Sequence, residues 1–173
     1  MEKMEQIGKA VLDYRFYPED DKYTDGAIED EMLEIARNCS PEQYERVIVE
    51  KKSWPILYHF SYLRENIIRW LPMDGSENVL EIGAGPGAIT GALCEKGRQV
   101  TVIDLSKKRC LINAYRHKDC DNLHFLVGNF QDIEPKLTEQ YDLITLIGVF
   151  EYAQFSIQSE DPFVDYLKRI RTH

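Results

Sequence analysis

Apolar residues in the N-terminal part of the chain recur every three or four positions, which is the spacing of an amphipathic helix. The stripes are Ile28, Met32 and Ile35; Tyr44, Val47 and Ile48; and Ile56, Phe60, Leu63 and Ile67. The sequence Ser-Pro-Glu-Gln at 40–43 has the composition of a helix start with a capping box. The pattern predicts that residues 1–72 are helical and form an N-terminal cap or lid, although residues 1–25 show no clean period.

The pattern changes after residue 76, where short apolar runs of the buried-strand type alternate with helical stripes. The predicted strands are 79–82, 100–103, 124–127 and 143–147, and the predicted helices lie around 88–96, 106–114 and 163–170. Such alternation is typical of a parallel sheet with helices on both faces. The sequence therefore predicts an α/β fold, a Rossmann-like doubly wound parallel sheet, in residues 73–173.

The chain has 173 residues and a formal net charge of −9, and residues 1–50 hold 14 acidic and 6 basic residues. No basic stripe is present, so the composition argues against a nucleic-acid partner. The run Lys107, Lys108 and Arg109 is interpreted as a solvated helix face. No apolar run has the roughly 18–20 residues that span a bilayer. The N-terminus lacks the apolar core of a signal peptide, so we expect a cytoplasmic protein.

Four cysteines stand in the sequence, at Cys39, Cys94, Cys110 and Cys120. No two of them have the two-residue spacing of a zinc site or a redox motif, and the four histidines are scattered. We interpret the cysteines as reduced structural thiols and predict no metal site.

Glycines are concentrated after the first predicted strand, in the sequence Glu-Ile-Gly-Ala-Gly-Pro-Gly at 81–87. Glycine lets the chain turn tightly and lets a ligand approach the bare backbone, and the following helix offers N–H groups to an anion. Asp104 ends the second strand, where a carboxylate can accept both hydroxyls of a ribose. The alternatives are a tight turn without a ligand and a helix N-cap. Together, the loop and the acid predict a nucleoside-containing cofactor.

The residue that discriminates between cofactors is Glu81. A carboxylate two residues before the first glycine would repel the pyrophosphate of NAD or FAD, whereas it suits a cofactor with cationic groups. S-adenosylmethionine carries an ammonium and a sulfonium and has no phosphate.

The segment from Val79 to Gly87 resembles the first motif of the class I S-adenosylmethionine-dependent methyltransferases. Three further segments agree with that family in order and spacing: 100–104, 125–130 and 141–152. The resemblance covers about residues 76–155. It implies that S-adenosylmethionine is the cofactor and that methyl transfer is the activity.

The resemblance also implies roles for individual residues. Gly83, Ala84, Gly85 and Gly87 pass under the methionine part of the cofactor, with Glu81 near its ammonium; Asp104 holds the ribose, Leu105 packs beside the adenine, Asn129 and Phe130 meet the adenine, and Gly148 lines the floor below the methyl group. Asn129 departs from the Asp common at that position, and Asp132 is an alternative partner. A core position is the alternative for Phe130.

The resemblance names no catalytic base. Glu151 and Tyr152 follow the fourth strand and are the nearest candidates, with solvated loop residues as the alternative. His59 is also interpreted as a packing residue, and Arg64 as a partner of a surface acid rather than of the cofactor's carboxylate. The exit loop lacks the Asn/Asp-Pro-Pro-aromatic sequence of enzymes that methylate amines of bases, so a small molecule or sugar is the expected acceptor.

The resemblance implies a seven-stranded sheet, of which the sequence shows four strands. The fourth, at 143–147, would then be an apolar edge open to pairing. We expect either a longer chain, or a second copy or the N-terminal arm to cover this edge. Two rival functions stay open: a non-catalytic module or inactive fragment that binds S-adenosylmethionine, and an NAD-dependent oxidoreductase.

Overall fold

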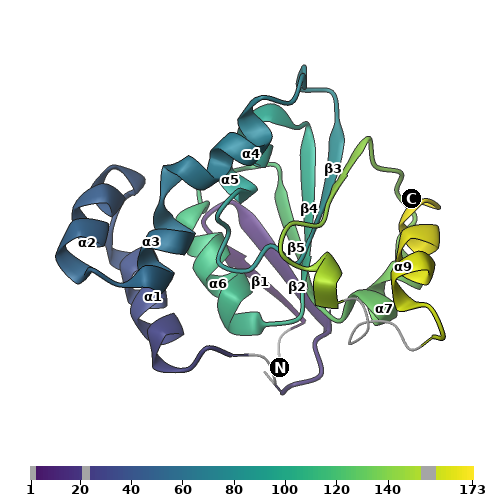
Figure 1. Ribbon diagram of the computed structural model, residues 1–173, viewed down its shortest axis with the longest axis horizontal. Helices are drawn as coiled ribbons and strands as arrows, with labels where there is room; N and C mark the ends of the chain where they lie inside the picture. Colours follow the sequence, from purple (N-terminus) through teal and green to yellow (C-terminus); the bar gives the residue numbers. More distant parts are fainter. Residues whose placement is uncertain (1–2, 21–23, 153–158) are drawn as a thin grey trace.

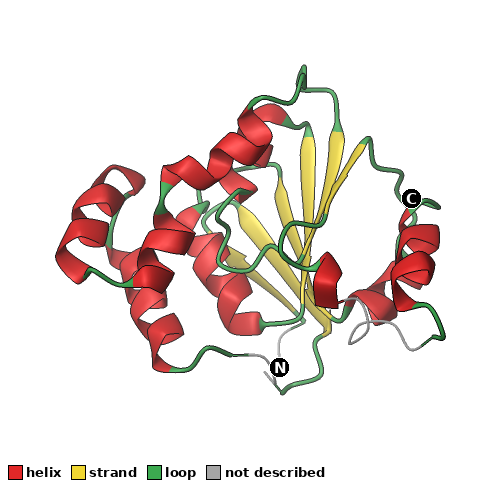
Figure 2. Ribbon diagram, in the orientation of Figure 1, coloured by secondary structure: helices red, strands yellow, loops and turns green. Residues whose placement is uncertain are grey.

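The computed structural model describes residues 3–20, 24–152 and 159–173. Its six strands form one sheet in the order β1-β2-β5-β4-β3-β6 (Figures 1 and 2). The strands are β1 (Met4–Ile7), β2 (Ala10–Phe16), β3 (Asn78–Ile82), β4 (Gln99–Asp104), β5 (Leu123–Gly128) and β6 (Leu143–Thr145). All neighbouring pairs are parallel except β1 with β2. The predicted Rossmann-like α/β fold is confirmed.

The N-terminal segment is strand rather than helix, so the prediction that residues 1–72 are helical is wrong for residues 4–16. β1 and β2 form an antiparallel hairpin, and β2 then pairs parallel with β5. Ala10, Leu12 and Tyr14 alternate along β2 and are buried in the main core. The sequence alternates apolar and polar residues over 12–16, so the signal of the strand is present there and the helical prediction overlooked it. The polar position Asp13 is fully buried and paired with Arg15.

The hairpin also settles one expectation about the sheet edge. It extends the sheet beside β5, whereas β6 lies at the opposite end of the strand order. The N-terminal arm therefore does not cover β6. Within the described residues β6 pairs with β3 alone.

Helices α1 to α4 form a layer beside the sheet, as the stripes predict from residue 27 onward (Figure 1). They are α1 (Ala27–Asn38), α2 (Tyr44–Lys51), α3 (Trp54–Phe60) and α4 (Asn66–Arg69). The capping box at 40–43 is present, since the Ser40 N–H donates to Gln43 Oε1 at 2.8 Å. The third stripe is broken at Ser61, whose side chain caps a short 3-10 turn, so α3 and α4 are separate.

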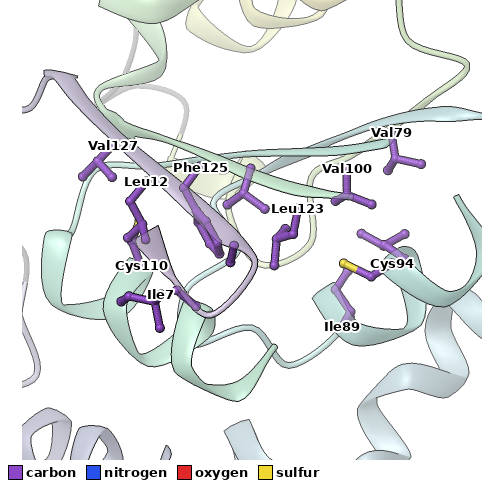
Figure 3. Close-up of a cluster of buried hydrophobic side chains, with 14 of the residues drawn as sticks. Ile7, Leu12, Val79, Ile89, Cys94, Val100, Cys110, Leu123, Phe125 and Val127 are labelled. Carbon is purple, nitrogen blue, oxygen red and sulfur yellow. The ribbon is translucent and has the colours of Figure 1, made fainter. Parts of the chain in front are cut away.

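The two faces of the sheet are covered by different helices. α5 (Thr90–Lys96) and α6 (Lys107–Arg116) pack on one face, and α7 (Phe130–Ile133) and α9 (Pro162–Ile170) lie on the other (Figure 1). Figure 3 shows the core on the α5/α6 side, where Val100, Leu123 and Phe125 point toward Cys94 and Cys110. All four cysteines are free thiols. None of the helices in the described ranges has the length and apolarity that crossing a membrane demands.

The basic run at the start of α6 is not a solvated face, in contrast to its interpretation from the sequence. Lys107 Nζ lies 4.7 Å from the ring centroid of Tyr14. Lys108 Nζ pairs with Asp30 at 2.7 Å, and Arg109 pairs with Glu29 at 2.7 Å. Some acidic residues of the N-terminal region therefore form ion pairs with basic residues of α6. The sequence could not show this match, because the partners are about 80 residues apart.

Candidate cofactor site

The glycine loop leaves the C-terminal end of β3, where the adjacent strand β4 also ends. The φ angles of Gly83, Gly85 and Gly87 are 71°, 55° and 79°, in the region that favours glycine. The Gly83 N–H donates to the Ile103 carbonyl at 2.7 Å, and the Gly85 N–H donates to Asp104 Oδ2 at 2.8 Å. The structure therefore joins the two features that the sequence analysis singled out into one hydrogen-bonded unit.

The glycines of the site fall into two kinds. A Cβ on Gly83 would lie 2.3 Å from a Val149 methyl, and one on Gly87 would lie 2.3 Å from Asn113 Oδ1, so these two allow close packing within the protein. A Cβ on Gly85 or on Gly148 would meet no atom of the described residues within 4 Å. The bare backbone is thus open to a ligand at Gly85 and Gly148, and closed by the protein on the Cβ side of Gly83 and Gly87. Ala84 is partly buried against the main core.

Asp104 is 8% exposed and holds both the loop and the helix that follows it. Its Oδ1 accepts the Ser106 N–H at 2.9 Å, while Oδ2 accepts the Gly85 N–H. Ser106 itself caps α6 through the Arg109 N–H. Ser106, rather than Asp104, is therefore the N-cap of α6. Each carboxylate oxygen can accept more than one hydrogen bond. Leu105, next along the chain, is 41% exposed.

Glu81 is buried beneath the loop, at 2% exposure. Its Oε2 accepts the Thr90 hydroxyl at 2.7 Å, and Thr90 Oγ1 accepts from Asn113 Nδ2 at 2.9 Å. Burial raises the pKa of Glu81 to about 7, and the negative charge of Asp104 adds to this shift. A carboxyl group that titrates near neutral pH beside a candidate ligand site is typical of functional sites.

Arg116, at the end of α6, also holds the loop, and the sequence analysis missed it. Its Nη1 donates to the Pro86 carbonyl at 2.5 Å. The guanidinium carbon lies 4.6 Å from the ring centroid of Phe60 and 5.7 Å from that of Tyr44. The guanidinium group of Arg116 thus contacts both the helical layer and the glycine loop. No local motif marks such a residue, because its partners come from three separate segments.

The adenine candidates are placed differently. Asn129 Oδ1 accepts the Gln131 N–H at 3.0 Å and caps α7. Phe130 is 5% exposed and its ring stacks on Tyr166 at 4.8 Å between centroids. The structure therefore places Phe130 in the core, the alternative that the sequence left open. Asp132 is exposed.

The candidate bases are not brought together with the glycine loop by any described contact. Glu151 is exposed on a 3-10 turn at Phe150–Tyr152, and the side chain of Tyr152 lies outside the described part. Burial and the nearby charges of Arg116, Arg109 and Arg64 lower the pKa of His59 to about 4. The ring of His59 packs against Tyr58 at 4.9 Å between centroids. Arg64 lies over the same tyrosine, with its guanidinium carbon 4.1 Å from the ring centroid.

The strand-end acid and the glycine loop define an α/β protein of the nucleoside-cofactor-binding class. The chain matches the methyltransferase domain family over residues 80–173, more than half of its length. It therefore belongs to this family, which confirms the resemblance to class I S-adenosylmethionine-dependent methyltransferases.

Three known proteins illustrate this likeness. Ribosomal RNA small subunit methyltransferase A of Pseudomonas putida is 32% identical over 84 residues, which are 49% of this chain and 30% of that protein. Precorrin 8W decarboxylase of Methanobacterium thermoautotrophicum has a TM-score of 0.50 and 18% identity, over 64% of this chain and 55% of that one. DhpI, solved with SAM and HEP, has a TM-score of 0.50 and 21% identity, over 87% and 62%. The two structures show the shared fold, and the chain spans less than two thirds of each of the three proteins.

Proposed function

We propose that this chain binds S-adenosylmethionine and forms part of a methyltransferase that acts on a small-molecule or sugar acceptor. The observation that carries the proposal is the hydrogen bond from the Gly85 N–H to Asp104. It fixes the open backbone of the loop beside the strand-end acid. A ligand with a ribose can then contact both the loop backbone and Asp104 without the entropic cost of ordering them on binding.

The residues present fit this cofactor. Gly85 and Gly148 leave space where a side chain would stand, and Asp104 presents a carboxylate that can accept ribose hydroxyls. S-adenosylmethionine, when bound, supplies a methyl group on a sulfonium, and its displacement leaves a neutral thioether. Positioning therefore supplies much of the catalysis. In this chain, the glycine loop and Asp104 would bind and orient the cofactor, and Arg116 holds the loop in place.

Glu81 supports this cofactor over NAD. Its carboxyl group lies buried under the loop, where an adjacent anionic pyrophosphate would raise the pKa of Glu81 further. A cationic ammonium would instead favour the ionised carboxylate. The rival oxidoreductase function requires the opposite electrostatics.

The charge distribution supports the proposed small-molecule or sugar acceptor. The basic run of α6 is engaged with acids and aromatic rings of the N-terminal region rather than presented to a phosphate backbone. RNA is the second candidate acceptor, because the curated relative at 32% identity is named as a ribosomal RNA methyltransferase.

The first test is a calorimetric titration of this chain with S-adenosylhomocysteine, with NAD as the control ligand. We expect saturable binding of S-adenosylhomocysteine only, and a loss of about 100-fold or more in Asp104→Ala, which removes the acceptor for the ribose and for the Gly85 N–H. Glu45→Ala is the matched control, since it removes an exposed acid on α2 that belongs to no candidate site. Binding that is unchanged in Asp104→Ala would contradict the site assignment.

A second test separates the acceptors. Labelled S-adenosylmethionine is incubated with the chain and either ribosomal RNA or a protein-free metabolite extract, and the label is followed by size. Label in the small-molecule fraction supports the proposed acceptor class, and label in RNA supports the second candidate. Binding without transfer to either would favour the non-catalytic module.

A further inference from the structure

The far face of the sheet carries a polar cavity that is separate from the cofactor site. It opens in two connected parts of about 240 Å³ and 450 Å³, which share Thr101, His124, Glu139 and Tyr141. These residues lie in the first halves of β4 and β5 and just before β6, whereas Gly85 and Asp104 lie at or beyond the strand ends. The short α7 covers the neighbouring part of this face at Leu126 and Ile133.

Two strands place polar side chains into this cavity at the same level. Thr101 and His124 are direct cross-strand partners of β4 and β5. Their neighbours Val100, Val102 and Phe125 point the other way, into the main core. Strands buried on both faces normally carry apolar residues at such positions. A threonine and a histidine side by side therefore need a polar partner.

That partner is missing within the described part of the chain. His124 Nε2 is buried and has no hydrogen-bond partner there. Burial raises the pKa of the Tyr141 hydroxyl and the nearby side chain of Thr101 acts against this rise, but the two make no hydrogen bond of ordinary geometry. Burial lowers the pKa of His124, so the ring is neutral near pH 7 and can donate one hydrogen bond. Buried polar atoms without partners are costly, which means that a bound molecule that pairs with both is stabilised.

The charges around the cavity indicate the kind of molecule. Arg15, Lys136 and Arg98 line it together with the carboxylate of Glu139, and the buried carboxylate of Asp13 is close enough to act on His124. Arg15 is paired with Asp13, and Arg98 donates to the neutral Asn78 side chain at 2.9 Å. This positive lining stands on a chain of net charge −9. Hydrogen bonds from such groups to an ionised acceptor are among the strong ones.

We propose that this cavity is a second binding site, distinct from the cofactor site, for a small anion that carries a carboxylate or a phosphate. His124 and Tyr141 donate to the anion, and Arg15 and Lys136 supply the positive field. Thr101 adds a hydroxyl at the floor. The proposal does not depend on methyl transfer, because none of these residues belongs to the glycine loop or contacts Asp104 in a described interaction.

The test is calorimetric titration of the chain with inorganic phosphate and, separately, with citrate, so that the two arms distinguish the phosphate from the carboxylate source. Tyr141→Phe removes only the hydroxyl. His124→Asn removes the group at Nε2, whereas His124→Gln restores a polar atom near that place. We expect at least one of the two anions to bind, and Tyr141→Phe and His124→Asn to weaken its affinity about tenfold or more. The affinity of His124→Gln should lie closer to that of the unmodified chain.

Two controls make the outcome decisive. Tyr62→Phe changes an exposed tyrosine of the helical layer and is expected to leave the anion affinity unchanged. Asp104→Ala is expected to lose S-adenosylhomocysteine and keep the anion, so failure of one site is distinguishable from failure of the other. If neither anion binds saturably, the cavity holds only water and the proposal is wrong. If an anion binds with the same affinity to every variant, it binds elsewhere, and this outcome also contradicts the proposed site.

Discussion

The loop after β3 and the loop after β6 leave neighbouring parallel strands, but they are built differently. The first is held by Asp104 at Gly85 and by Arg116 at Pro86, and Glu81 lies buried beneath it. The second presents Gly148, where an added Cβ would meet no described atom within 4 Å, and Glu151, which is exposed to solvent. Val149 of the second loop packs on Gly83, and the Phe150 ring packs on Phe163 and Tyr166 at 5.4 and 6.2 Å between centroids. The comparison teaches that hydrogen bonds and a buried acid position the first loop, whereas apolar packing positions the second.

The largest effect that separates the two loops is expected from alanine at their glycines. Gly87→Ala forces a Cβ to within 2.3 Å of Asn113 Oδ1 at a φ of 79°, so strain and overlap together should lower the free energy of unfolding by about 3 kcal/mol. Gly148→Ala has a similar φ of 74° with open space, so only the conformational cost of about 1 kcal/mol is expected. Urea denaturation measures both. Equal losses would show that packing does not distinguish the loops.

A smaller effect is expected from the cation that joins the helical layer to the first loop. Arg116→Met keeps an unbranched side chain between Phe60 and Tyr44 but loses the hydrogen bond to the Pro86 carbonyl. The affinity for S-adenosylhomocysteine should fall about tenfold, because a hydrogen bond to a charged group contributes roughly 1.5–3 kcal/mol. Arg116→Lys should recover part of this loss. An unchanged affinity in Arg116→Met, at unchanged stability, would remove Arg116 from the site.

A separate effect, spread over a range of pH, concerns the stability contribution of Glu81. Its pKa is raised by burial from 4.5 to about 7 in the folded chain, so the folded state binds the proton more tightly than the unfolded state does. The contribution of Glu81 to stability is therefore present below about pH 4.5 and is lost as the pH rises toward 7. The corresponding change is of the order of 3 kcal/mol. Glu81→Gln should flatten this part of the pH profile, measured by urea denaturation from pH 5 to 8.

The same carboxyl group gives the smallest expected signal, in binding. If a cationic group of the ligand approaches Glu81, the pKa of Glu81 falls and the carboxyl group releases protons near pH 7. Calorimetry of S-adenosylhomocysteine in buffers of different ionisation enthalpy would detect less than one proton per site. The affinity should rise modestly between pH 6 and pH 8, and Glu81→Gln should abolish both effects. Proton uptake on binding would contradict the assigned role of Glu81.

Much of the fold was predictable because its signals are local. The four strands of residues 79–147 are apolar runs bounded by glycine and polar residues, and the helix start at 40–43 carries a recognisable capping box. The hairpin was missed because its first strand, Met4–Ile7, shows no alternation and the alternation of the second covers only residues 12–16. Phe130 could not be assigned either, because its partner Tyr166 is brought to it by α9 from 36 positions away.

By itself, the sequence determined the α/β class, the family, and the glycine loop with its strand-end acid, because each depends on residues that are close together or regularly spaced. Only the tertiary structure decided which elements meet. It placed the hairpin beside β5, matched the cations of α6 with N-terminal acids, and set Arg116 between the helical layer and the loop. Long-range packing brings such partners together, and no local pattern of one strand or helix encodes where its distant neighbour will lie.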